Sequence, residues 1–103
     1  MFRYFEYYCS EEISWKLQEI GYEPYYFYSN GCPKITIYEA QSFLRDEGII
    51  VYPVVDRYND GGETTWQCEI YIPFLKLYRI GQNLSFEVAL QEGIKEAVSL
   101  YQK

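Results

Sequence analysis

The chain has 103 residues, of which 49% are hydrophobic and 23% charged, a composition typical of one folded domain and not of a disordered tail. Fifteen acidic residues against nine basic ones give a net charge of −6, and no two basic residues are adjacent. Such a surface repels phosphate backbones, which argues against nucleic-acid binding. We therefore expect a single domain over residues 1–103 and no nucleic-acid partner.

A first helix is predicted over about residues 11–20. Ser10 can cap its N-terminus, and two glutamates follow where the helix dipole favours negative charge. An apolar stripe at helical spacing and a C-terminal glycine complete the pattern: Ile13, Leu17, Ile20 and Gly21. Trp15 falls on the opposite side of this helix, where it either covers a neighbouring element or is exposed.

A short strand is predicted over the aromatic segment 25–28, which lies between Pro24 and the turn residues 29–31. Alternation along a strand would place Tyr26 and Tyr28 on one face and the other two rings on the opposite face. If helices cover both faces, all four rings belong to the core. If one face is open, Tyr26 and Tyr28 form a binding surface.

A second helix is predicted over about residues 37–47. The segment Thr36-Ile37-Tyr38-Glu39 has the form of a capping box, which begins a helix. An apolar face and a closing glycine follow: Ile37, Ala40, Phe43, Leu44 and Gly48.

An antiparallel hairpin is predicted next. Residues 48–58 are rich in β-branched side chains, but Pro53 makes them an edge strand or a bulged one. The turn residues 59–62 precede a strictly alternating strand over 64–72. One face carries Trp66, Cys68, Ile70 and Ile72, and the other carries Thr65, Gln67, Glu69 and Tyr71. Residues 74–80 and 2–8 are candidates for further short strands.

The last helix has the strongest pattern, with Asn83 or Ser85 as its cap. Its apolar stripe is Phe86, Leu90, Gly93, Ile94, Ala97 and Tyr101. Glycine inside a helix costs about 1 kcal/mol relative to alanine, so Gly93 predicts a close approach of helix to sheet.

The element order α-β-α-β-β-(β)-α predicts an α+β fold, with an antiparallel sheet of three to four strands and about three helices. The pattern fits either a two-layer arrangement or an α/β/α sandwich.

Catalytic chemistry has little support in the sequence. The chain has no histidine, which removes the commonest general base and metal ligand. Phosphate-binding and hydrolase signatures are absent. Residues 56–67 depart from a calcium-binding loop at Tyr58 and Gln67, so a hairpin turn is the better interpretation. We expect no enzyme activity, no cofactor and no metal site.

Three cysteines, Cys9, Cys32 and Cys68, are too few and too widely spaced for a disulfide framework or a zinc knuckle. We expect free and mostly buried thiols, with Cys32, near Lys34, as the only candidate for a reactive one. No apolar stretch reaches the roughly 18 to 20 residues that span a bilayer, and residues 1–12 do not resemble a signal peptide. We therefore expect a cytoplasmic protein that does not bind membranes.

Three segments carry a resemblance to a known group: SEEISWKLQEIGY, ITIYEAQSFLRDEGIIVYPV and SFEVALQEGIKEAVSLYQK. Each segment carries one motif. The first ends in Leu-x-x-Ile-Gly-Tyr, the second has Phe-Leu-Arg before an Ile/Val strand, and the third reads Ala-Leu-x-x-Gly-Ile-x-x-Ala over residues 89–97. This pattern resembles small uncharacterised proteins encoded by phages and prophage-like elements of gut anaerobic bacteria, although Phe43 stands where tryptophan is common. The resemblance implies an α+β domain of mobile-element origin and brings no catalytic residues.

The function expected from these features is protein interaction through an acidic, tyrosine-bearing surface, with a host or phage protein as partner. The candidate surface residues are Tyr26, Tyr28, Trp15 and Tyr71. A strand edge at 49–58 or 25–28 could also pair with a second copy to give a homodimer. The alternative is a small-molecule or carbohydrate-binding domain that uses Tyr26, Tyr28 and nearby acids in a concave pocket.

Overall fold

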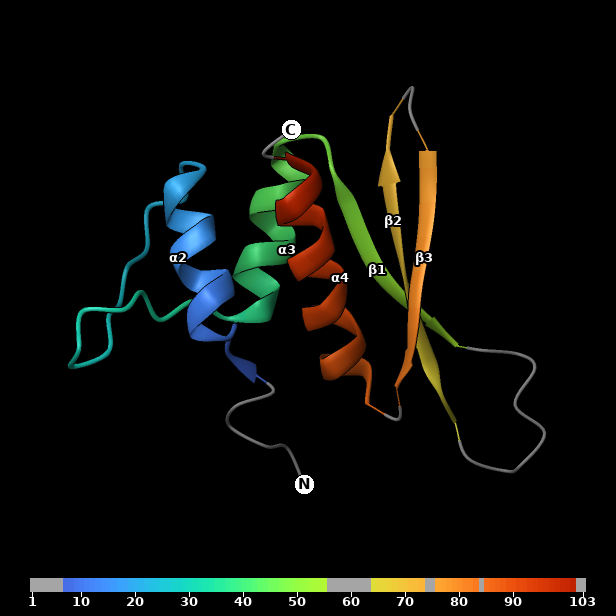
Figure 1. Ribbon diagram of the computed structural model, residues 1–103, viewed down its shortest axis with the longest axis horizontal. Helices are drawn as coiled ribbons and strands as arrows, with labels where there is room; N and C mark the ends of the chain where they lie inside the picture. The colour runs from blue at the N-terminus through green and yellow to red at the C-terminus, as the bar shows by residue number, and fades with distance from the viewer. Residues whose placement is uncertain (1–6, 56–63, 74–75, 84, 102–103) are drawn as a thin grey trace.

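Three helices and three strands make up the part of the chain that the computed structural model describes, residues 7–55, 64–73, 76–83 and 85–101 (Figure 1). In chain order these are α2 (Glu11–Glu19), α3 (Ile37–Asp46), β1 (Ile50–Val55), β2 (Trp66–Ile72), β3 (Lys76–Asn83) and α4 (Phe86–Tyr101). The predicted α+β fold is confirmed.

The strands form one antiparallel sheet in the order β1-β2-β3. In the predicted hairpin Val51 pairs with Ile70 and Pro53 with Cys68, and Ile70 pairs in turn with Tyr78 of β3. The candidate strand at 74–80 is present from Lys76 and extends to Asn83, while residues 74–75 lie outside the described residues. The turn at 59–62 and most of the candidate strand at 2–8 lie outside the described residues.

All three helices lie on the same side of the sheet (Figure 1). Helix α4 contacts every strand, while α3 packs on α4 and β1 and α2 packs on α4. Of the two arrangements that the sequence allowed, the structure therefore has the one with helices on a single face. Within the described residues, nothing covers the opposite face of the sheet.

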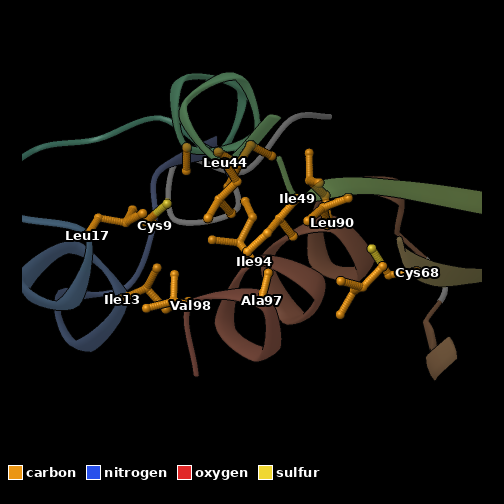
Figure 2. Packing of buried hydrophobic residues seen from close by; sticks show 14 of the residues in the cluster. Cys9, Ile13, Leu17, Leu44, Ile49, Cys68, Leu90, Ile94, Ala97 and Val98 are labelled. Atoms are coloured by element: carbon orange, nitrogen blue, oxygen red, sulfur yellow. The ribbon is translucent and has the colours of Figure 1, made fainter. Parts of the chain in front are cut away.

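Helix α4 supplies the centre of the core. Leu90, Ile94 and Val98 are fully buried and lie between side chains of α2 and α3 and those of the sheet (Figure 2). Gly93 faces β1 and β2, and a Cβ atom at this position would collide with the Cys68 sulfur and lie 2.8 Å from Val51 Cγ1. The predicted close approach of helix to sheet is confirmed.

The predicted caps begin the helices as expected. The Ser10 hydroxyl accepts the Ile13 N–H, and Thr36 forms a complete capping box with Glu39. Ser85, and not Asn83, caps α4, because its hydroxyl accepts the Val88 N–H while Asn83 belongs to β3. Both α2 and α3 end one residue earlier than predicted.

The strand predicted at 25–28 is wrong. This segment forms a tight loop. Its described residues make a single isolated β-bridge, between Phe27 and Pro33. The Tyr28 N–H donates to the Cys32 carbonyl, and the Lys34 N–H donates to the Tyr26 carbonyl. Pro33 cannot donate to a ladder. The loop also lies at the opposite end of the molecule from the sheet (Figure 1), so none of the described strands is available to pair with it.

Candidate functional site

The uncovered face of the sheet carries a row of apolar side chains. Val51 and Cys68 face α4, so alternation turns their neighbours away from the helices. Ile50, Tyr71 and Leu77 lie side by side across the three strands, and Tyr52 lies in the next row. These four side chains are between 37% and 46% exposed. We call Ile50, Tyr52, Tyr71 and Leu77, with Glu69 and Arg79, the open sheet face.

An ion pair lies at the centre of the open sheet face. Arg79 Nε is 2.8 Å from Glu69 Oε2, and the Glu69 side chain is only 11% exposed. The Tyr52 hydroxyl also bonds to Glu69, and this hydrogen bond is the main cause that raises the pKa of Tyr52. The carboxylate is therefore compensated, and the face is close to neutral in a chain whose net charge is −6.

The edge of β1 offers few groups for pairing with another strand. Gln41 Nε2 of α3 donates to the Val51 carbonyl at 2.7 Å, so this carbonyl points away from β2 and is already bonded. Pro53, two residues further, has the same orientation and no N–H. Natural proteins block exposed strand edges in this way, which disfavours sheet extension through β1.

The aromatic loop after α2 is the second exposed feature. Tyr25 and Tyr26 are 81% and 70% exposed, and Phe27 is also exposed. Tyr28 is half-buried instead: its ring packs edge-to-face on Tyr8, with centroids 6.5 Å apart, and the Lys34 ammonium lies 5.5 Å from its centroid. Tyr26 is therefore much more accessible than Tyr28.

The four predicted surface residues fall on separate parts of the molecule. Trp15 is 41% exposed on α2, Tyr26 and Tyr28 belong to the loop, and Tyr71 lies on the open sheet face. Figure 1 shows the loop and the sheet at opposite ends of the molecule, so Tyr71 cannot act together with the loop tyrosines.

The sequence interpretation missed four members of the open sheet face: Ile50, Tyr52, Leu77 and Arg79. Alternation within 64–72 had already assigned Glu69 and Tyr71 to the face opposite Cys68. Extending that face to β1 and β3 requires the register between strands, which pairs Ile50 with Tyr71 and Tyr71 with Leu77. With the register known, the alternation of each strand identifies all four residues.

A shallow groove of about 480 Å³, largely open to solvent, runs between α3 and the segment after α2. Its aromatic lining is Tyr22, Tyr25, Tyr38 and Phe43, and its polar lining is Thr36, Glu39, Ser42 and Asp46. Neither Tyr26 nor Tyr28 is among the lining residues, although Tyr28 lines a second hollow together with Glu11.

The cysteines are free and buried, as predicted. Burial raises the pKa of Cys9 and Cys68 to about 12, and burial together with Glu11 raises the pKa of Cys32. The Cys32 thiol borders a second hollow of about 410 Å³, but it is only 2% exposed and stays protonated at neutral pH. The structure therefore gives no support to a reactive Cys32.

Within the described ranges, no three cysteine or acidic side chains come together as metal ligands would. Among the helices of these ranges, none has the length and apolar content to cross a bilayer.

No protein-family model matches the chain, and comparisons with curated proteins and with solved structures gave no significant match.

Proposed function

We propose that the protein is a non-enzymatic interaction module that binds a protein partner through the open sheet face. The observation that carries this proposal is the row Ile50, Tyr71 and Leu77, which leaves large apolar side chains in solvent on a face that no described element covers. Contiguous exposed apolar patches on soluble domains mark interaction sites more often than scattered apolar residues do.

The electrostatics of this face support the same proposal. A partner that covers it removes Glu69 and Arg79 from water, and burying an unpaired charge costs several kcal/mol. Here the pair is already formed, and the Tyr52 hydroxyl gives Glu69 a further hydrogen bond. The partner therefore meets a neutral surface with an apolar row, which resembles the centre of a protein interface.

The partner in this proposal is a protein of the host cell or of the mobile element that the sequence resemblance suggests, encountered in the cytoplasm. Binding through the face, and not through the edge of β1, fits the capped carbonyl of Val51 and the missing donor of Pro53.

Site-specific photo-crosslinking tests the proposal. A benzophenone amino acid replaces Tyr71 or Leu77 in one pair of variants, and it replaces Trp15 or Tyr26 in a control pair. All four positions are exposed, so each probe is accessible in the free protein. After irradiation in cells of the native host, we expect one discrete adduct from positions 71 and 77 and none of that mass from the control positions.

Two results would overturn the proposal: adducts that form only at positions 15 or 26, and adducts that are equally diffuse at all four positions. An adduct of twice the mass of the chain identifies a second copy as the partner. A Leu77→Glu substitution should abolish the adduct at position 71, because it places an unpaired charge in the buried interface.

A further inference from the structure

The groove between α3 and the segment after α2 has a rigid aromatic floor. The Tyr22 ring packs edge-to-face on Phe43, with centroids 5.4 Å apart. The Tyr22 hydroxyl donates to Glu39 Oε2 at 2.5 Å, and the other oxygen of Glu39 accepts the Thr36 hydroxyl at 3.0 Å. Both rings are therefore fixed before any ligand arrives, which lowers the entropy cost of binding.

The walls of the groove are more exposed than its floor. Tyr25 and Tyr38 stand at its sides with large parts of their rings in solvent. Ring faces carry the negative part of the aromatic quadrupole and attract cations. The groove thus offers aromatic surfaces from the loop and from α3 at once.

Two carboxylates lie in the same groove. Glu39, Ser42, Phe43 and Asp46 follow one another at helical spacing along α3, so both acids lie on one stripe. None of the eight lining residues is basic. Arg45 comes close at the rim, where Nη2 bonds to the Ser42 hydroxyl at 3.0 Å, but it is not part of the lining.

We propose that this groove binds an arginine side chain of a partner polypeptide, stacked on the aromatic walls and attracted by the negative charge that Glu39 and Asp46 give the groove. This site is separate from the open sheet face, and the inference does not depend on the function proposed for that face.

The chemistry favours arginine over the other candidate ligands. A guanidinium is planar, so it stacks on a ring and bonds a carboxylate in one pose, whereas a lysine ammonium is a strongly hydrated point charge. A sugar would also stack on these rings, but it gains nothing from charge. A comparison of the affinities for a cation and for its neutral isostere therefore distinguishes arginine binding from sugar binding.

Titration of the ¹⁵N-labelled full chain, followed by NMR, tests the proposal with capped arginine (N-acetyl-arginine amide) as the probe. We expect saturable shifts at the amides of Tyr22, Ser42 and Phe43, and a weaker response to capped lysine. Capped citrulline, which is neutral and nearly isosteric, should bind at least about fivefold more weakly.

The aromatic contribution has a matched pair of variants. Tyr25 and Tyr26 are adjacent and both largely exposed, but only Tyr25 lines the groove. We expect Tyr25→Leu to weaken capped-arginine binding by about two- to fivefold and Tyr26→Leu to leave it unchanged.

The charge contribution has its own control. Glu39→Gln keeps the capping box, since glutamine also serves at that position, and should weaken binding by about two- to fivefold, as should Asp46→Asn. Glu96→Gln removes the same charge from the exposed side of α4 and should have no effect.

Three results would overturn the proposal: no saturable shift with capped arginine, equal binding of capped citrulline, and equal losses for Tyr25→Leu and Tyr26→Leu. Saturable binding of methyl glucoside in place of capped arginine would assign the groove to carbohydrate.

Discussion

Gly93 determines how closely α4 approaches the sheet. The residue lies on the buried stripe of the helix, where any side chain would meet the Cys68 sulfur and Val51. A glycine inside a helix loses more conformational entropy on folding than alanine does. In this chain that cost is offset by the packing of α4 directly on β1 and β2.

We expect Gly93→Ala to lower the free energy of unfolding by about 1–3 kcal/mol, because overpacking outweighs the roughly 1 kcal/mol gain in helix propensity. Urea denaturation measures the change. Ser99→Ala, on the exposed side of the same helix, is the control and should change stability by less than about 0.5 kcal/mol.

A second substitution tests the cause of that loss. Cys68→Ala removes the sulfur that the new methyl group would meet, so the double variant should lose less stability than the sum of the two single variants. Strict additivity of the two losses would contradict the close-packing explanation.

Helix α3 is the element that connects the candidate groove to the core. Its buried residues Ile37, Ala40 and Leu44 face the core, while the stripe from Glu39 to Asp46 faces the groove. The capping box at its N-terminus fixes where the helix begins and therefore which residues share each face. A shift of the helix start would move both faces together.

We expect Thr36→Ala to lower the free energy of unfolding by about 1 kcal/mol, because the Glu39 N–H then loses its side-chain acceptor at 3.0 Å. Thr36→Ser keeps the hydroxyl and is the matched control. Thermal or urea unfolding compares the two variants. If alanine is as stable as serine at this position, the side-chain cap does not contribute to stability.

At the scale of the whole molecule, one face of the sheet packs against the helices and the other face is exposed to solvent. The core on the helix side contains two buried thiols. Cys68 lies under α4, and Cys9 lies beside α2 (Figure 2). Burial raises the pKa of both thiols from 9.0 to about 12, since a thiolate is poorly solvated in the core.

This shift makes global stability sensitive to alkaline pH. Below about pH 9 the thiols are protonated in both the folded and the unfolded state, so they contribute no pH dependence. Between pH 9 and about 12 only the unfolded chain releases their protons, and stability should fall by up to about 1.4 kcal/mol per pH unit for each thiol.

Urea denaturation at pH 7 to 11 measures this dependence. The profile should be shallower in Cys68→Ala, which removes one of the two groups. Tyrosines with raised pKa values, such as Tyr52, act in the same direction. A free energy of unfolding that stays constant from pH 8 to 11 would contradict burial of the thiols in protonated form.

Local sequence determined the helices, their caps, the β1–β2 hairpin and the role of Gly93, because periodicity, capping hydroxyls and alternation act over a few residues. The same rules failed at 25–28, where aromatic content predicts a strand but none of the described strands pairs with it. Strand propensity describes side chains that fit a sheet, and it does not create one.

Only the tertiary structure decided which side chains come together on each candidate surface. The open sheet face joins side chains from three strands through their register, and the groove joins the loop after α2 to α3. Tyr71 was identifiable from the sequence because alternation turns it away from the core. Its neighbours Ile50 and Leu77 were not, since their proximity depends on pairing between strands, and which face the helices leave open depends on the packing of the whole chain.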